Sequence, residues 1–238
     1  MAVTTCATTD VGLLREQNED SYFAGTTVFA VADGLGGHAA GEVASAIAVE
    51  VVSRLDGHEF ATSDEARDAL VQAAREANAE ILKRAAAEPD QAGMGTTLTA
   101  ALLHEERVYL AHVGDSRGYL RRGDEPLRRV TTDHTLVEGF VRQGLLSPEE
   151  AAVHPERSVL TQALGLDEDV LVDAVEPPSP RPGDVLLLCS DGLTEPLTDD
   201  EIDQVLTASA ERPCEDLVAA ANAAGGPDNI TVVVLRWR

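Results

Sequence analysis

Some apolar residues along the chain form short runs typical of strands and others recur at helical spacing, which predicts a mixture of strands and helices. The run Val28–Ala32 is short, apolar and partly β-branched, which is typical of a buried strand. Apolar residues then recur at helical spacing from Ala44 to Leu55, and again from Leu70 to Ile81. Each of these two segments therefore predicts a helix with one buried face.

Strand-like runs elsewhere follow one another through short turns, which predicts antiparallel pairing. The predicted strands are residues 3–13, 21–24, 28–32, 96–103, 107–113, 119–120, 170–175, 185–189 and 230–235. The predicted helices outside the 134–164 region are residues 41–55, 63–87, 199–209 and 213–224. Apolar helix faces need apolar sheet faces, so the economical fold is α+β: a four-layer α-β-β-α sandwich of two antiparallel sheets flanked by helices. Strands at both ends of the sequence favour one domain over residues 1–238.

Residues 134–164 have a different pattern. Val137, Phe140 and Val141 predict a short helix that Gly144 ends, and Ser147–Pro148 is a typical helix start. Two short helices inserted among strands predict a small helical flap at about residues 136–160.

Composition narrows the class of protein. The chain has 238 residues, 44% of them hydrophobic, and a net charge of −24, which disfavours binding to nucleic acid and to anionic membranes. It shows no signal peptide and no apolar stretch long enough to span a bilayer, so we expect a cytoplasmic protein. Cys6, Cys189 and Cys214 are unevenly spread without a CxxC motif. This spacing argues for a reducing compartment and against a disulfide framework or a cysteine zinc site, and Cys189 is expected in the core.

The strand Val28–Ala32 ends at Asp33, and a glycine-rich loop leads to His38. The spacing Gly34-x-Gly36-x-x-Ala39 loosely fits the dinucleotide-binding fingerprint. Three features weigh against that interpretation: Asp33 would sit beside the pyrophosphate, no parallel βαβ unit follows, and no acidic residue closes a second strand about 20 residues on. A carboxylate at the end of a buried strand, beside bare backbone, is also where a metal site could form.

Four aspartates share this setting at a strand end next to glycine or in a turn, and two further acidic residues lie one strand earlier. The four are Asp33, Asp115, Asp191 and Asp228, and the two earlier residues are Glu19 and Asp20. Any one of them is typical of a turn. Clustered buried carboxylates would repel one another, and divalent cations would remove that cost. Oxygen ligands select Mg²⁺ or Mn²⁺ rather than zinc.

The order of several motifs matches a known family. They are Arg15-x-x-Asn18-Glu19-Asp20, Asp33-Gly34-x-Gly36-Gly37-His38, Gly95-Thr96-Thr97, Gly114-Asp115-Ser116-Arg117, Thr131-x-Asp133-His134, Leu160-x-x-Ala163-Leu164-Gly165, Ser190-Asp191-Gly192 and Gly226-x-Asp228-Asn229. On these motifs the chain resembles a bacterial member of the metal-dependent protein serine/threonine phosphatase family, the PPM or PP2C-like group. The resemblance spans almost the whole chain and implies the same sandwich fold.

The resemblance also implies a metal site. Asp33 would bridge two ions and the Gly34 carbonyl would bind one of them, while Asp191 and Asp228 would hold the other. Asp115, with Asp191, matches a third site in bacterial members. The ions would be Mn²⁺ or Mg²⁺, two in the core and a possible third.

Four more residues take roles by the same resemblance. Glu19 and Asp20 would act through metal-bound waters, Arg15 would grip the substrate phosphate, and His38 would protonate the leaving oxygen. Together with Asp33, Arg15 and His38 would form the catalytic set.

The implied activity is hydrolysis of phosphoserine and phosphothreonine in proteins, with a metal-bridged hydroxide attacking phosphorus in line. Phosphorylated proteins would be the partners, with a Ser/Thr kinase and its substrates as an expectation from the family, and the chain would act as a monomer. Two alternatives stay open. One is a catalytically silent phosphatase-like binding module in a signalling cascade, and the other is a phosphatase acting on a regulatory protein of a sigma-factor cascade.

Overall fold

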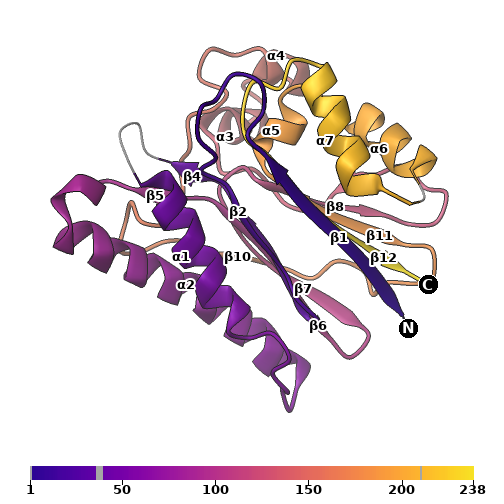
Figure 1. Ribbon diagram of the computed structural model, residues 1–238, viewed down its shortest axis with the longest axis horizontal. Coiled ribbons are helices and arrows are strands. Elements are labelled where there is room, and N and C mark those ends of the chain that lie inside the picture. The colour runs from indigo at the N-terminus through magenta and orange to yellow at the C-terminus, as the bar shows by residue number, and fades with distance from the viewer. Residues whose placement is uncertain (1, 36–39, 210) are drawn as a thin grey trace.

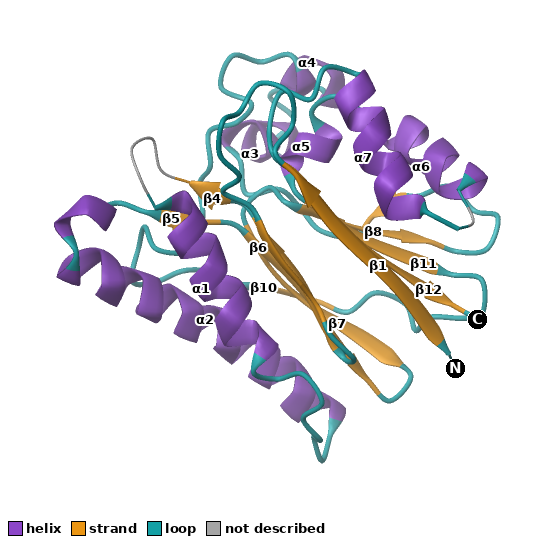
Figure 2. Cartoon of the chain, viewed as in Figure 1, coloured by secondary structure: helices purple, strands orange, loops and turns teal. Residues whose placement is uncertain are grey.

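The computed structural model describes residues 2–35, 40–209 and 211–238, which form two five-stranded sheets packed face to face (Figures 1 and 2). One sheet has the strand order β1-β12-β11-β8-β9 and the other β10-β7-β6-β3-β2. The strand pairs are antiparallel, and a two-stranded ribbon of β4 and β5 lies beside them. Helices cover the outer faces, so the predicted sandwich is confirmed.

The strands are β1 (Val3–Asp10), β2 (Ser21–Ala24), β3 (Val28–Ala32), β4 (Gly34–Leu35), β5 (Gly95–Thr96), β6 (Leu98–His104), β7 (Arg107–Val113), β8 (Arg117–Arg121), β9 (Arg128–Arg129), β10 (Asp173–Val175), β11 (Val185–Cys189) and β12 (Ile230–Trp237). The helices are α1 (Gly41–Ser53), α2 (Ser63–Ala87), the 3₁₀ turn η1 (Pro89–Gln91), α3 (Leu136–Arg142), α4 (Pro148–Ala152), α5 (Asp191–Thr194), α6 (Asp199–Ala208) and α7 (Pro213–Ala223).

The core explains why β3 is apolar at every position. Phe29 and Val31 point into the layer between the two sheets, whereas Val28, Ala30 and Ala32 pack against the layer of α1 and α2. A strand buried on both faces has no polar side. On the far side of the molecule, α6 and α7 cover the other sheet (Figure 1).

The expected flap is present as two short helices, α3 and α4, within residues 136–160. Together with α5 and the β4–β5 ribbon it lies at one end of the sandwich, while the two termini lie at the other (Figure 1). None of the helices in the described residues is long and apolar enough to span a bilayer.

Two predicted strands are shorter than expected. The first ends at Asp10 rather than at residue 13, because Gly12 adopts a φ of +77° and turns the chain. The segment 170–175 pairs with β7 only from Asp173 onward, and Val170 packs into the core without joining the ladder. An apolar run indicates burial but does not identify a hydrogen-bonding partner.

The spacing of the cysteines argued against a disulfide framework, and that prediction is wrong for one pair. Cys6 of β1 and Cys214 of α7 form one, with their Cα atoms 6.1 Å apart, while Cys189 is a free thiol in the core as expected. The two bonded residues are separated by 208 positions, and they meet only because β1 pairs with β12 and α7 packs over both strands. Sequence spacing alone does not reveal such a pair.

Candidate functional site

The backbone of Asp33 is held where β3 ends. Its N–H donates to Thr97 Oγ1 at 2.9 Å, and its carbonyl accepts from Thr97 N–H at 2.9 Å and from Thr96 Oγ1 at 2.8 Å. Thr97 Oγ1 also lies 2.7 Å from Ser116 Oγ, the residue after Asp115. The two threonines therefore tie together the segments that carry two of the predicted ligands.

Asn229 fastens the N-terminal loop of the site to the C-terminal loop. Its Oδ1 accepts from the Glu19 N–H at 2.8 Å, and its Nδ2 donates to the carbonyls of Gln17 at 2.9 Å and Val11 at 3.0 Å. One amide side chain thus satisfies three backbone groups of residues 11–19. Asp228 directly precedes it and takes its position from the same loop.

Asp191 begins α5, and Ser190, which separates it from β11, contacts the buried Asp20. Ser190 Oγ donates to Asp20 Oδ2 at 2.7 Å and accepts from the Thr231 N–H at 3.0 Å. Asp20 is 8% exposed, so it supports the site from within the protein.

Arg15 pairs with Asp228 in this structure, with 2.6 Å between Nη2 and Oδ2. The guanidinium was expected to hold a substrate phosphate. Its side chain remains 56% exposed, so most of it is accessible from solvent while one nitrogen contacts the carboxylate.

A cavity of about 520 Å³ brings seven of the nine predicted site residues together: Arg15, Glu19, Asp33, Gly34, Asp115, Asp191 and Asp228 line it. Asp20 is the buried support described above. His38 lies outside the described residues, so its predicted role as an acid stays a prediction.

Burial and mutual repulsion raise the pKa values of the clustered carboxyl groups. Burial raises the pKa of Asp191 to about 6, of Asp20 to about 7 and of Asp115 to about 8. It also raises the pKa of Asp33 well above its usual range, and the charges of Asp20, Asp191 and Asp115 add to the effect. A hydrogen bond between the carboxyl groups of Asp33 and Asp191 favours a proton on Asp33.

The donor set fits hard divalent cations. Asp20 Oδ1 and Asp191 Oδ1 are buried without a hydrogen-bond partner, and a cation would satisfy oxygens of this kind. Carboxylate and carbonyl oxygens match Mg²⁺ and Mn²⁺. Across residues 2–35, 40–209 and 211–238, no three His, Cys, Asp or Glu side chains are already arranged as a ligand set. The fit therefore rests on donor chemistry and unbalanced charge.

The stability of the metal-free protein should fall as the pH rises from about 6.5 to 8.5. Asp115, whose ordinary pKa is 3.8, keeps its proton in the folded state up to about pH 8, whereas the unfolded chain has already lost it. The free energy by which this proton stabilises the folded state therefore decreases as the pH rises toward 8. The loss from this group alone is about 2 kcal/mol, at about 1.4 kcal/mol for each pH unit. Urea unfolding in chelator measures it.

The window starts at pH 6.5 because His112 affects stability in the opposite direction below that pH. Burial lowers the pKa of His112 to about 4, so its contribution to stability increases with pH up to about 6.5 and is constant above. Asp115→Asn should make the fall in stability between pH 6.5 and 8.5 less steep, and Asp33 and Asp20, whose pKa values are also raised, account for the slope that remains. Wild-type stability that is constant or rising across this window would contradict the interpretation.

Two polar residues of the cavity were not singled out from the sequence. Glu195 and Ser158 line the same cavity, and Arg157 Nη2 of the flap binds Glu195 Oε1 at 2.7 Å. The spacing of Asp191 and Glu195, four positions apart on one helical turn, is the signal that could have identified Glu195. Ser158 has no comparable signal.

The chain resembles bacterial protein phosphatases in sequence. It is 45% identical over 233 residues to the serine/threonine protein phosphatase PstP of Mycobacterium tuberculosis, covering 96% of this chain and 44% of PstP. It therefore spans less than half the length of that relative. It is 40% identical over 236 residues to the serine/threonine phosphatase stp of Listeria innocua, covering 95% of this chain and 93% of stp.

Solved structures agree with the sequence comparison. The M. tuberculosis PstP/Ppp crystal structure superposes with a TM-score of 0.92 at 42% identity, covering 100% of both chains. The catalytic domain of PstP in complex with two manganese ions superposes with a TM-score of 0.87 at 41% identity, covering 98% of this chain and 97% of that one. The sequence profile of protein phosphatase 2C matches residues 15–225. This chain belongs to the protein phosphatase 2C family.

Proposed function

We propose that this domain is a protein serine/threonine phosphatase that hydrolyses phosphoserine and phosphothreonine with Mn²⁺ or Mg²⁺. One observation carries the proposal: four aspartates from four separate strand ends line one cavity with an arginine at its side. Arginine and divalent cations both recognise phosphate oxygens. The relatives named serine/threonine phosphatases, and the two manganese ions bound by the PstP domain, support it.

Different residues of the chain would have different roles in this reaction. Asp33, the Gly34 carbonyl, Asp191 and Asp228 would hold two core ions, and Asp115 with Asp191 a third. Bound cations would supply Lewis-acid activation of water and neutralise charge on the phosphate.

The remaining groups would orient the substrate and the waters of the site. Arg15 would donate to two phosphate oxygens with its planar fork, sharing its present contact with Asp228. Glu19 and Asp20 would accept from waters around the ions. His38 would donate the proton to the leaving oxygen.

Phosphorylated proteins, including a Ser/Thr kinase and its substrates, are the proposed partners. Protein phosphorylation consumes ATP, so we propose a cytoplasmic site of action. Seven of the nine proposed site residues line one cavity within a single chain, so one copy of the chain supplies most of the proposed site, and we propose that it acts as a monomer.

The first test is hydrolysis of p-nitrophenyl phosphate and of a phosphothreonine peptide, with Mn²⁺, with Mg²⁺ and with chelator, by the wild type and by Asp191→Ala. We expect turnover that requires metal and is lost in the variant, because Asp191 would be shared by the core and the third sites. A folded protein without turnover in any metal would contradict the proposal and favour a phosphatase-like binding module.

A further inference from the structure

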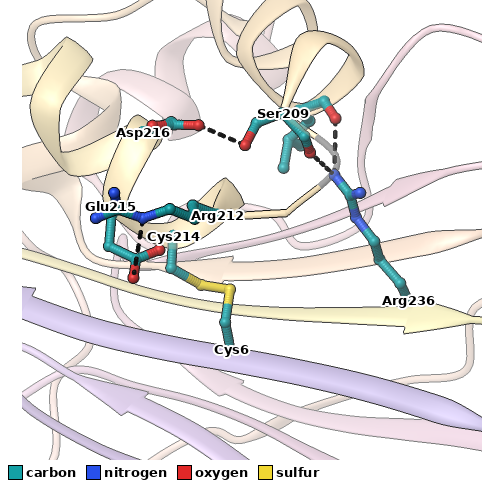
Figure 3. Close-up of a disulfide and its surroundings, with 8 residues drawn as sticks. Cys6, Ser209, Arg212, Cys214, Glu215, Asp216 and Arg236 are labelled. Carbon is teal, nitrogen blue, oxygen red and sulfur yellow. Dashed lines mark hydrogen bonds and ion pairs between the residues drawn. A yellow bond between two sulfur atoms is a disulfide. The ribbon is translucent and has the colours of Figure 1, made fainter.

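The Cys6–Cys214 disulfide joins β1 to α7, the two elements that lead into the loops on one side of the candidate site. Cys6 lies in the middle of β1, on the face that packs against α7, and Cys214 is the second residue of α7 (Figure 3). β1 leads directly into residues 11–20, which hold Arg15, Glu19 and Asp20. α7 leads through residues 224–227 to Asp228.

The same two segments meet again beside the cavity. Asn222, in the last turn of α7, donates from Nδ2 to Asp10 Oδ1 at 3.1 Å, and the Leu13 N–H donates to the Gly226 carbonyl at 2.8 Å. Beyond these contacts lies the Arg15–Asp228 ion pair. β1 and α7 are thus connected covalently at one end and by hydrogen bonds at the end that reaches the site.

Other contacts hold the start of α7 to different neighbours. Ser209 Oγ donates to Asp216 Oδ2 at 2.5 Å, and Arg236 of β12 donates to the Ser209 carbonyl at 2.6 Å (Figure 3). β1 itself is an edge strand, paired through eight residues with β12. Opening the disulfide would leave both sets of contacts in place, so it should loosen α7 against β1 without unfolding either element.

We propose that the Cys6–Cys214 disulfide positions the Arg15 and Asp228 side of the metal site, and that its reduction weakens divalent-cation binding there. The inference deepens the proposed function, since it assumes that Asp228 holds a cation. Cys6 and Cys214 are positioning residues, because neither lines the cavity.

The reductant would be a dithiol of the thioredoxin class. Its thiolate attacks the Sγ of Cys6, the less buried of the two residues, and the S–S bond breaks with Cys214 leaving as a thiolate. Cys214 lies in the first turn of α7, where the helix dipole favours a thiolate, although Glu215 and Asp216 are close by. The second thiol of the reductant then releases Cys6. Two electrons and two protons pass to the protein, giving two thiols, and the reductant becomes a disulfide.

The test measures Mn²⁺ binding by calorimetry on oxidised wild type and on wild type that has been reduced with a dithiol and desalted without air. We expect the Mn²⁺ dissociation constant to rise about tenfold on reduction, the lower end of the range seen when a supporting partner of a metal ligand is lost. The near-ultraviolet circular dichroism of the aromatic side chains, read at wavelengths beyond the absorption of the disulfide itself, should stay the same in both forms. Cys6→Ser/Cys214→Ser should show the weaker binding with or without reductant, which excludes Cys189 as the source of the response.

Three results would overturn the proposal: equal dissociation constants in the two wild-type forms, a double variant that still responds to reductant, or loss of the aromatic near-ultraviolet signal on reduction. Loss of the aromatic signal would mean that the disulfide stabilises the whole fold and does not act on the site in particular. The readout is independent of turnover. Redox-dependent Mn²⁺ binding in a protein that hydrolyses neither substrate would contradict the proposed function and support the positioning role.

Discussion

Asp33→Asn is expected to lower phosphatase turnover by at least about a thousandfold, because a metal's charge stabilisation is worth several kcal/mol and each 1.4 kcal/mol or so is a factor of ten. The amide keeps the shape of the carboxyl group but removes the negative charge that would bridge two ions. Turnover of p-nitrophenyl phosphate at saturating Mn²⁺ measures the loss.

The same substitution should make the metal-free protein more stable. Asp33 is surrounded by Asp20, Asp115 and Asp191, whose charges raise its pKa, and a neutral amide relieves that repulsion. Asparagine can also donate to Asp191 as the protonated carboxyl group does. Urea unfolding in chelator should therefore give a larger free energy of unfolding for the variant than for the wild type at pH 8.

Asp124→Asn is the matched control. Asp124, like Asp33, is next to a glycine beyond the end of a strand, but it is exposed and lies outside the cavity. It should change neither turnover nor stability. Unchanged turnover in Asp33→Asn, or a metal-free variant less stable than wild type, would contradict the assignment of Asp33.

Gly192→Ala is expected to lower the free energy of unfolding by about 3 kcal/mol, the upper end of the usual cost of overpacking. A Cβ at Gly192 would lie 1.9 Å from the carbonyl oxygen of Asn229, a backbone atom that cannot move alone. Asn229 would have to shift with its hydrogen bonds to Glu19, Gln17 and Val11. Mn²⁺ binding should weaken as well.

Gly139→Ala provides the comparison, since Gly139 is also helical and a Cβ there meets nothing within 4 Å. That change should be neutral or stabilise the protein by up to about 1 kcal/mol, the difference in helix propensity. Thermal and urea unfolding of the pair measure the contrast. Equal stabilities would mean that the backbone of α5 can move away from Asn229 at little cost.

Much of the candidate site was predictable because the proposed metal ligands follow a local rule. Asp33, Asp115 and Asp191 follow apolar strands and Asp228 precedes one, and the alternation of apolar and polar residues locates strand ends without knowledge of the fold. The sandwich followed from the number of strands and the short turns between them. Family motifs then gave roles that strand ends alone do not.

The unpredicted features depend on contacts between distant parts of the chain. The three hydrogen bonds of Asn229 reach loops more than 200 positions away, and the Cys6–Cys214 bond depends on how α7 lies across β1. Glu195 lines the cavity from the end of α5, a short helix that was not among the predicted elements. The hydrogen bonds of Asn229 and the disulfide correspond to no repeated spacing of residues in the sequence.

The pairing of β1 with β12 has a consequence during synthesis. Arg15 and Asp228 are 213 positions apart, so at about 5 to 20 residues per second a ribosome needs about 10 to 40 seconds to translate from one to the other. Through that interval β1 lacks its only neighbour in the sheet order, and residues 11–20 lack the side chain of Asn229. A nascent chain therefore cannot assemble this half of the site, and a chain truncated before β12 should emerge without it.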